Sequence, residues 1–148
     1  MKLAYITGAT KGIGRATAVT LANAGWNLIL LARDLEMLEM LRDELSDTGS
    51  TINLVKCNLS NSNEIDNSIN ESIKKYGCPS VLINNAGCAF NGNLVEMPLT
   101  KWQEIIQINL TSVFHICSLI VPEMRKNGGL IINVSSHASY NAFPQWGA

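Results

Sequence analysis

The sequence predicts an α/β fold in which a doubly wound parallel sheet is covered by helices on both faces. Short apolar runs alternate along the whole chain with longer segments that have the period of amphipathic helices. This order predicts parallel strands joined by right-handed crossovers, which place the helices on the two faces of the sheet. The apolar runs are continuous, as expected for strands covered on both faces. Because the 148 residues contain no repeat, low-complexity tract or linker, we expect residues 1–148 to form one domain.

The first two strand–helix units follow directly from this pattern. Residues 3–6 form a buried strand, and the helix after the glycine-rich turn carries an apolar stripe that begins at Ile13 and stops at Gly25. The second strand is the continuous run 27–32. Regularly spaced leucines over 35–45 predict the second amphipathic helix.

The third unit and the fourth strand continue the alternation. Residues 51–56 form the third strand, and 62–76 form a helix with isoleucines on one face and Gly77 at its end. The run 80–83 is the fourth strand, and the turn 84–87 with the sequence NNAG follows it. A short apolar run between a glycine and a polar turn is consistent with a buried strand.

A long helix and a fifth strand complete the pattern. We expect an irregular loop up to Pro98 and then a helix over 101–126 that is N-capped by Thr100. Pro122 lies within this helix, so we expect a kink or a break there. Residues 130–134 form the fifth strand.

Composition excludes several classes of protein. A formal net charge of −1 gives no basis for binding nucleic acid, and the four cysteines have no CxxC or histidine-flanked spacing that would indicate a metal site. We expect reduced thiols, with Cys57 and Cys117 buried, in a cytoplasmic protein. The chain enters a strand at once, which leaves no room for a signal peptide, and its apolar runs are too short to span a membrane.

The glycine-rich turn between the first strand and the first helix indicates dinucleotide binding. Glycines permit a tight turn, a close approach of the backbone to a pyrophosphate and close packing of the helix on the strand. The free N–H groups and the positive dipole end of the new helix favour phosphate. The residues of this turn that we expect at the cofactor are Gly8, Thr10, Lys11, Gly12, Ile13 and Gly14.

Five motifs in a fixed order carry a family resemblance. The turn TGATKGIG (residues 7–14) resembles the TGxxxGIG motif of the short-chain dehydrogenases/reductases. The other four matches are Asn58-Leu59, Asn84-Asn85-Ala86-Gly87, Asn109 in Ile108-Asn109-Leu110, and Ile131-Ile132-Asn133-Val134-Ser135-Ser136. The resemblance covers all 148 residues. It implies a Rossmann-type NAD(P)-binding domain with five strands in the order 3-2-1-4-5, incomplete at its C-terminal end.

The residues after the second strand predict the choice of cofactor. Arg33 stands where enzymes that use NAD carry an acidic residue, and an arginine there can pair with the extra phosphate of NADP. Lys11 can add a second positive charge, so we expect NADP(H), with NAD(H) as the alternative. A solvated surface charge is the competing interpretation of Arg33. Asp34 is either a ribose ligand or, as we favour, the N-cap of the second helix.

The resemblance implies further contacts along the cofactor. Asn58 replaces the family's usual aspartate but keeps an acceptor oxygen, and together with Leu59 it would contact adenine. Asn85, Ala86 and Gly87 would lie along the cofactor, where small side chains leave space for the ribose. Both segments also suit simple turns after strands.

The resemblance assigns the chemistry to Ser136 and Asn109. Ser136, after the fifth strand, would hydrogen-bond the carbonyl or hydroxyl oxygen of the substrate, and Asn109 would hold a water on the proton-relay path. In the family a tyrosine is the general acid/base, and a lysine four residues later lowers its pKa and binds the ribose. Ser135 points the other way by strand alternation and is assigned to structure. The competing interpretation of Asn109 is a satisfied polar residue in a helix interior.

The family's tyrosine and lysine have no counterpart in the sequence. Counting from Ser136, the tyrosine falls at position 149, and the sequence ends at Ala148. Tyr140 is followed four residues later by Pro144 instead of lysine, so we interpret it as a loop or pocket aromatic, and His137 as a loop residue. We therefore expect that the chain is truncated before the Tyr-x-x-x-Lys motif and is inactive as a fragment.

The predicted function is an NADP(H)-dependent oxidoreductase that transfers a hydride between nicotinamide and a small carbonyl or alcohol substrate. The rival interpretations are a non-catalytic, redox-sensing NADP(H)-binding protein and a vestigial fragment. The loop 88–98 lacks a basic cluster, which favours a carbonyl reductase over a 3-oxoacyl-carrier-protein reductase. The resemblance also implies a homo-dimer or homo-tetramer, and we expect neither nucleic acid nor a membrane as a partner.

Overall fold

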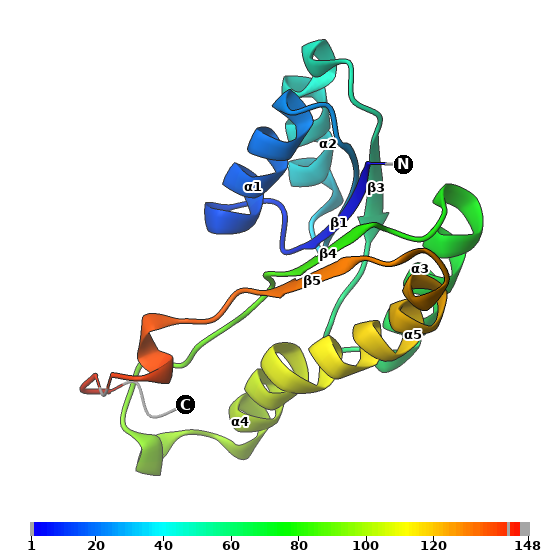
Figure 1. Cartoon of the computed structure of the whole chain (residues 1–148). Coiled ribbons are helices and arrows are strands. Elements are labelled where there is room, and N and C mark those ends of the chain that lie inside the picture. The colour runs from blue at the N-terminus through cyan, green and yellow to red at the C-terminus, as the bar shows by residue number, and fades with distance from the viewer. Residues whose placement is uncertain (1, 142, 146–148) are drawn as a thin grey trace.

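The structure is an α/β fold built on a five-stranded parallel sheet, which confirms the predicted fold class. The computed structural model describes residues 2–141 and 143–145. The strand order is β3-β2-β1-β4-β5, as Figure 1 shows, which confirms the predicted order, and every neighbouring pair is parallel. The strands are β1 (Leu3–Thr7), β2 (Asn27–Ala32), β3 (Ile52–Lys56), β4 (Val81–Asn84) and β5 (Leu130–Asn133).

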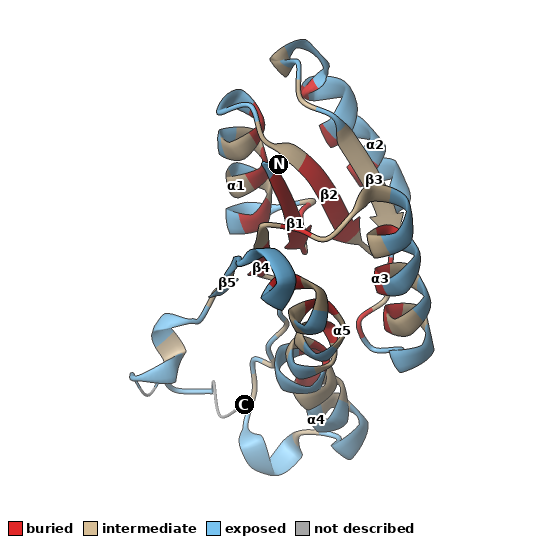
Figure 2. Cartoon of the chain, turned by 45° about the vertical axis from the view of Figure 1, so that its right-hand side comes forward, coloured by how far each residue is buried: buried red, intermediate tan, exposed pale blue. Residues whose placement is uncertain are grey.

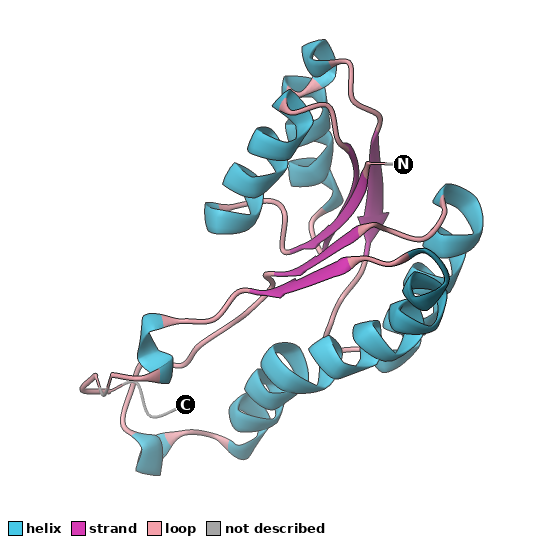
Figure 3. Ribbon diagram, in the orientation of Figure 1, coloured by secondary structure: helices cyan, strands magenta, loops and turns pink. Residues whose placement is uncertain are grey.

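Helices cover both faces of the sheet, as Figure 3 shows. The first two helices pack on one face, and the third and fifth pack on the other. The fourth helix leads into the fifth through a π-turn at Gln107–Thr111. The α-helices are α1 (Gly12–Asn23), α2 (Leu35–Glu44), α3 (Ser62–Tyr76), α4 (Leu99–Ile106) and α5 (Ser112–Asn127).

The core consists of two apolar layers, one on each face of the sheet. Along β1, Ala4 and Ile6 pack in the layer under α1 and α2, whereas Leu3 and Tyr5 pack in the layer under α3 and α5. Consecutive strand positions are therefore apolar because each face needs its own buried side chains. Burial is deepest in β1 and β2, and the edge strand β5 is largely exposed (Figure 2).

The long helix begins two residues earlier than predicted, and Thr100 is not its N-cap. α4 starts at Leu99, and Pro98 occupies the N-cap position with extended backbone angles (φ −61°, ψ 139°). Proline fixes its own φ and has no N–H to satisfy, so a helix can begin directly after it. Thr100 consequently lies inside the first turn of α4, and no side chain caps this end.

α5 runs through Pro122 to Asn127, so the helix does not break there. Proline deprives the carbonyl four residues earlier, that of Ser118, of its helical donor. Ser118 is exposed, so water can bind this carbonyl and the helix continues. The irregularity of the long helix lies instead in the π-turn between α4 and α5.

The long helix corrects our expectation that no apolar segment is long enough to span a membrane. Leu99–Asn127 is 29 residues long, and its most apolar window has a mean hydropathy of 1.6 with 28% of the window buried. A helix that covers a sheet has the same length and composition, so this property is weak evidence for a membrane span. The residues by which this helix packs in the core are Ile108, Ile116, Ile120 and Met124.

All four cysteines are free thiols. Cys57 is buried, as predicted, whereas Cys117 is only half-buried and its sulfur lies 3.6 Å from Asn84 Nδ2. Cys117 packs against the apolar core, as expected for a small hydrophobic residue, but it also has this polar neighbour. Burial raises the pKa of the Cys57, Cys78 and Cys88 thiols, which keeps them protonated at neutral pH.

Candidate functional site

Hydrogen bonds join the carboxyl ends of β1 and β4 into one unit. The hydroxyl oxygen of Thr7, the last residue of β1, accepts from the backbone N–H groups of Asn85 and Ala86 at 3.0 Å each. The side-chain amide of Asn85 donates in return to the carbonyl oxygens of Thr7 and Gly8, at 3.0 and 3.1 Å. These bonds fix the position of the glycine-rich turn relative to the NNAG turn.

Close packing at Gly8 and Gly14 leaves no room for a side chain. Gly8 has a φ of +65°, and a Cβ atom there would lie 2.8 Å from the Cα atom of Ala86. A Cβ atom on Gly14 would overlap the Gly8 carbonyl oxygen and the side-chain amide of Asn85. Gly12, with a φ of +54°, has open space beside it. Glycine is required at position 8 by both conformation and contact, and at position 14 by contact alone.

The N-terminus of α1 fits a phosphate group. Lys11 occupies the N-cap position without a side-chain capping bond, so no side chain of this residue satisfies the first N–H groups of the helix. The first turn contains no acidic residue, Lys11 and Ile13 are exposed, and Thr10 is half-buried. A phosphate placed here would meet N–H donors, the positive end of the helix dipole and the charge of Lys11.

Asp34 and Arg33 differ in their surroundings after β2. The Asp34 carboxylate accepts from a backbone N–H in the first turn of α2 at 3.1 Å, which confirms the predicted N-cap. Arg33 is exposed, and its charge reaches the NNAG side of the site. Burial and the Glu104 carboxylate raise the pKa of the Cys88 thiol, whereas the charges of Lys101 and, to a smaller extent, Arg33 oppose this rise. Arg33 is therefore the side chain of this pair that remains available to an anionic ligand.

Backbone and side-chain hydrogen bonds hold the turn after β3, and one of them runs from the Asn61 N–H to the Asn58 carbonyl oxygen at 3.0 Å. The Glu64 carboxylate accepts from the Asn58 N–H at 2.9 Å, and Asn58 Oδ1 accepts from the Ser60 N–H at 3.1 Å. Gln107 Nε2 donates to the carbonyl oxygen of Leu59 at 3.3 Å, and Leu59 is buried. The side-chain oxygen of Asn58 already takes part in a local turn, which agrees with the competing interpretation of this residue.

Asn109 lies in the π-turn between α4 and α5 and not in a regular α-helix. π-turns inside helices are frequent at functional sites. The hydroxyl of buried Ser112 donates to the carbonyl oxygen of Ile108 at 2.7 Å, which gives this carbonyl a side-chain partner within the widened turn.

Asn109 clamps the loop that follows the NNAG motif. Its Oδ1 accepts from the Cys88 N–H at 2.9 Å, and its Nδ2 donates to the Cys88 carbonyl oxygen at 2.8 Å. A Cβ atom on Gly87 would lie 3.4 Å from Asn109 Oδ1. Asn109 is exposed, and this clamp uses one acceptor and one donor function of its side-chain amide, which agrees with the competing interpretation of a satisfied polar residue within a helix.

Ser136 leaves the sheet at the same edge as the NNAG turn. Its hydroxyl accepts from the Ala138 N–H at 3.1 Å and caps the short turn His137–Ser139. Beneath it, Asn84 Nδ2 donates to Asn133 Oδ1 at 2.9 Å, which ties the last residues of β4 and β5 together. Asn84 Oδ1 is buried without a hydrogen-bond partner in the described part of the chain.

Tyr140 and His137 pack against each other beyond Ser136. Their ring centroids are 4.8 Å apart in an edge-on arrangement, and Tyr140 is 74% exposed. Within residues 2–141 and 143–145, neither side chain hydrogen-bonds the Ser136 hydroxyl. This agrees with the interpretation of both as loop residues. Ala148, which precedes the position counted for the family's tyrosine, lies outside the described residues.

Four polar residues of this site were given no role from the sequence, namely Thr7, Glu64, Gln107 and Ser112. Thr7 carries a usable signal, because a hydroxyl at the end of an otherwise apolar buried strand requires a partner. Gln107 and Ser112 carry none, because their roles depend on the π-turn, and apolar spacing does not reveal such a turn.

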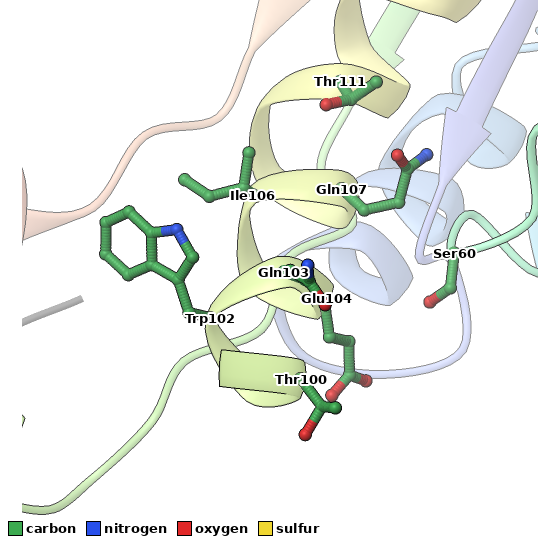
Figure 4. Close-up of a pocket in the computed structure, with 8 residues that line it drawn as sticks. All are labelled: Ser60, Thr100, Trp102, Gln103, Glu104, Ile106, Gln107 and Thr111. Carbon is green, nitrogen blue, oxygen red and sulfur yellow. The ribbon is translucent and has the colours of Figure 1, made fainter. Parts of the chain in front are cut away.

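A hollow of about 530 Å³ lies beside α4 and borders this site at Gln107 and Ser60. Figure 4 shows that all but one of the lining residues belong to the long helix and that Gln107 extends toward the Ser60 segment. The lining residues are Ser60, Thr100, Trp102, Gln103, Glu104, Ile106, Gln107 and Thr111.

Comparisons with known proteins agree with the geometry of the site. The family model described as short chain dehydrogenase matches residues 2–148. A 3beta-hydroxysteroid dehydrogenase of Mediterraneibacter gnavus is 35% identical over 144 residues, which are 97% of this chain and 52% of that protein. A 3-oxoacyl-[acyl-carrier-protein] reductase of Staphylococcus aureus is 34% identical over 137 residues, 91% of this chain and 56% of that protein.

A solved structure shows the same fold. The crystal structure of a metagenomic short-chain oxidoreductase in complex with NADP has a TM-score of 0.93 and 33% identity, and the match covers 98% of this chain and 66% of that one. The chain thus spans a little over half the length of the two curated relatives.

Proposed function

The chain belongs to the short-chain dehydrogenase family, and from this premise we propose that it binds NADP(H) as part of an oxidoreductase acting on a carbonyl/alcohol pair. The observation that carries the proposal is the open N-terminus of α1 beside the packed glycines Gly8 and Gly14, where the backbone can approach a pyrophosphate. Bound NADPH would supply the hydride for the reaction.

The proposal gives each part of the site one task. Backbone N–H groups at the start of α1, with Thr10, Gly12 and Ile13 around them, would hold the pyrophosphate. Leu59, Asn58 and the Asn85–Gly87 turn would flank the adenosine half of the cofactor and the ribose. Ser136 would orient the substrate oxygen, and Asn109 would keep the Gly87–Cys88 segment in place and hold a water for the proton relay.

A polypeptide limited to residues 1–148 contains no tyrosine–lysine pair placed to act on the oxygen held by Ser136. Loss of a positioned general acid lowers rates by roughly 10²- to 10⁴-fold. We therefore propose that this polypeptide binds the cofactor and has little or no turnover by itself. Reading the encoding DNA past the codon for Ala148 tests this: tyrosine at 149 and lysine at 153 would support the enzyme. A stop codon would favour the non-catalytic cofactor-binding protein or the vestigial fragment.

We propose NADP(H) over NAD(H) because Arg33 remains free to meet a phosphate while Asp34 is engaged as a helix cap. A guanidinium pairs with phosphate through two parallel hydrogen bonds. Lys11 would add a second charge at the same end of the cofactor. The known NADP complex of a relative with the same fold supports this choice.

Replacing Arg33 by alanine should weaken NADPH binding by about 10- to 100-fold, the loss expected for one charge-assisted contact. NADH lacks the extra phosphate, so its dissociation constant should change by less than about twofold. Fluorescence titration of both cofactors at one salt concentration measures this difference. The control is Arg42→Ala, because Arg42 is an exposed arginine on α2 that pairs with Asp43. Equal losses for NADPH and NADH would contradict the assignment of Arg33.

The relatives leave the substrate class open, since one is named for a hydroxysteroid and another for a carrier-protein-linked acyl group. We propose a small carbonyl or alcohol substrate, a cytoplasmic location and a homo-dimer or homo-tetramer for the whole protein. Sedimentation of the full-length protein would test the assembly.

A further inference from the structure

The adenine end of the proposed cofactor site has two walls, and one short piece of helix contacts both of them. The first wall is the turn Asn58–Ser60 after β3, and the second is the Gly87–Cys88 segment after β4. Asn109 binds the backbone of Cys88 through both of its amide atoms. Two residues earlier in the same helix, Gln107 binds the carbonyl oxygen of Leu59.

We propose that Gln107 is a positioning residue that sets the spacing between these two walls. This inference rests on the proposed function. Several hydrogen bonds that hold the Asn58–Ser60 turn are local, since they involve Glu64, the Asn58 side chain and the Asn61 N–H, which donates to the Asn58 carbonyl oxygen. The Gln107 bond spans 48 positions of the sequence and joins the turn to the helix that carries Asn109. It therefore fixes the turn relative to the opposite wall, which the local bonds do not.

Both contacts come from the π-turn at Gln107–Thr111, which begins at Gln107 and contains Asn109. Residues two positions apart in a helix lie on nearly opposite sides of it, so the two side chains can contact two separate segments of the chain. The buried Ser112 hydroxyl supports the widened turn through its bond to Ile108. Figure 4 shows Gln107 extending from the helix toward Ser60, away from Trp102.

Replacing Gln107 by leucine removes the amide donor and keeps a similar side-chain volume. It should therefore weaken ligand binding at the adenine end of the site and leave binding at the glycine-rich turn unchanged. Two probes separate the ends of the site: adenosine 2′,5′-bisphosphate for the adenine end, and inorganic pyrophosphate for the glycine-rich turn. We expect Gln107→Leu to raise the dissociation constant of the bisphosphate roughly three- to tenfold, the effect of one hydrogen bond. The dissociation constant of pyrophosphate should change less than about twofold. Calorimetry or NMR titration of residues 1–148 measures both.

The matched control is Gln103→Leu. Gln103 lines the same hollow one turn earlier and makes no side-chain hydrogen bond within the described residues. The Gln103→Leu variant should bind both probes with the same dissociation constants as the unchanged chain. A readout that needs no ligand is amide exchange at Ser60, whose N–H bonds to Asn58 Oδ1. This exchange should be faster in Gln107→Leu and unchanged in Gln103→Leu.

The outcomes separate this inference from the proposed function. If the unchanged chain binds the bisphosphate and Gln107→Leu binds it equally well, the role of Gln107 is wrong and the proposed function stands. Equal weakening of bisphosphate and pyrophosphate would mean a general structural defect and would also overturn the positioning role. If the unchanged chain binds neither probe, the proposed function fails, and the inference fails with it.

Discussion

Replacing Gly14 by alanine should raise the dissociation constant of the cofactor by about 100-fold while leaving the sheet assembled. The added methyl group would overlap the Gly8 carbonyl oxygen and the Asn85 amide, and both belong to the unit that joins β1 to β4. To relieve the overlap, α1 must move away from the strand, which displaces the N–H groups offered to the pyrophosphate. Loss of two hydrogen bonds to a charged group corresponds to about a 100-fold rise in the dissociation constant. The overpacking itself should lower the free energy of unfolding by about 1–3 kcal/mol.

The matched control is Gly25→Ala, which separates contact from backbone strain. Gly25 has a φ of +74° and nothing within 4 Å of an added Cβ atom, and it lies at the end of α1 away from the site. Alanine there should lower stability by about 1–2 kcal/mol through strain alone, with NADPH affinity unchanged. NADPH titration and urea unfolding of both variants make the comparison. If Gly14→Ala binds NADPH normally, the pyrophosphate does not lie on the N-terminus of α1.

The strands were predictable because each is a short apolar run bounded by glycine or polar residues. β2 was predicted to the residue, and the other strands to within one or two residues. A strand buried on both faces requires apolar residues at every position, so the run itself marks its ends. The helix α3 was also predicted to the residue, since it begins after the capping Asn61 and ends at Gly77.

The long helix was predicted less well, because local rules conflict there with the surrounding structure. Thr100 has the chemistry of an N-cap, but Pro98 already starts the helix. Proline usually breaks helices, but α5 continues through Pro122, and Ser118, whose carbonyl oxygen loses its helical donor, is an exposed residue. The side chains of the π-turn bind two loops that are distant in the sequence, and the spacing of apolar residues does not reveal such a turn.

The motif residues could be located from the sequence, but not their hydrogen bonds. Asn85 was expected along the cofactor. In the structure, its side-chain amide donates hydrogen bonds to the backbone of the glycine-rich turn. Asn109 was expected to act on water, and both of its amide atoms bind the backbone of Cys88. Such bonds join parts of the chain that are far apart in the sequence. These bonds can be identified only when the structure of the sheet is known, because the sheet brings the ends of β1 and β4 together.

Replacing Thr7 by valine should destabilise the protein more than the similar size of the two side chains suggests. Valine has the same shape but no hydroxyl oxygen, so the N–H groups of Asn85 and Ala86 would lose their acceptor next to a buried position. Each buried donor without a partner costs about 1–3 kcal/mol. Because both donors are only partly buried, we expect a loss of about 2–4 kcal/mol in the free energy of unfolding, measured by urea denaturation.

The conservative variant Thr7→Ser keeps the hydroxyl and removes only a methyl group, so it should lose no more than about 1 kcal/mol. The two variants should also differ in NADPH binding, because the Thr7 hydroxyl sets the NNAG turn against the glycine-rich turn. Thr7→Val should weaken NADPH at temperatures where the variant is still folded, and Thr7→Ser should not. If serine and valine were equally destabilising, the methyl group and not the hydroxyl would hold this corner of the site. The coupling between the two cofactor-binding turns would then have to come from the Asn85 side chain alone.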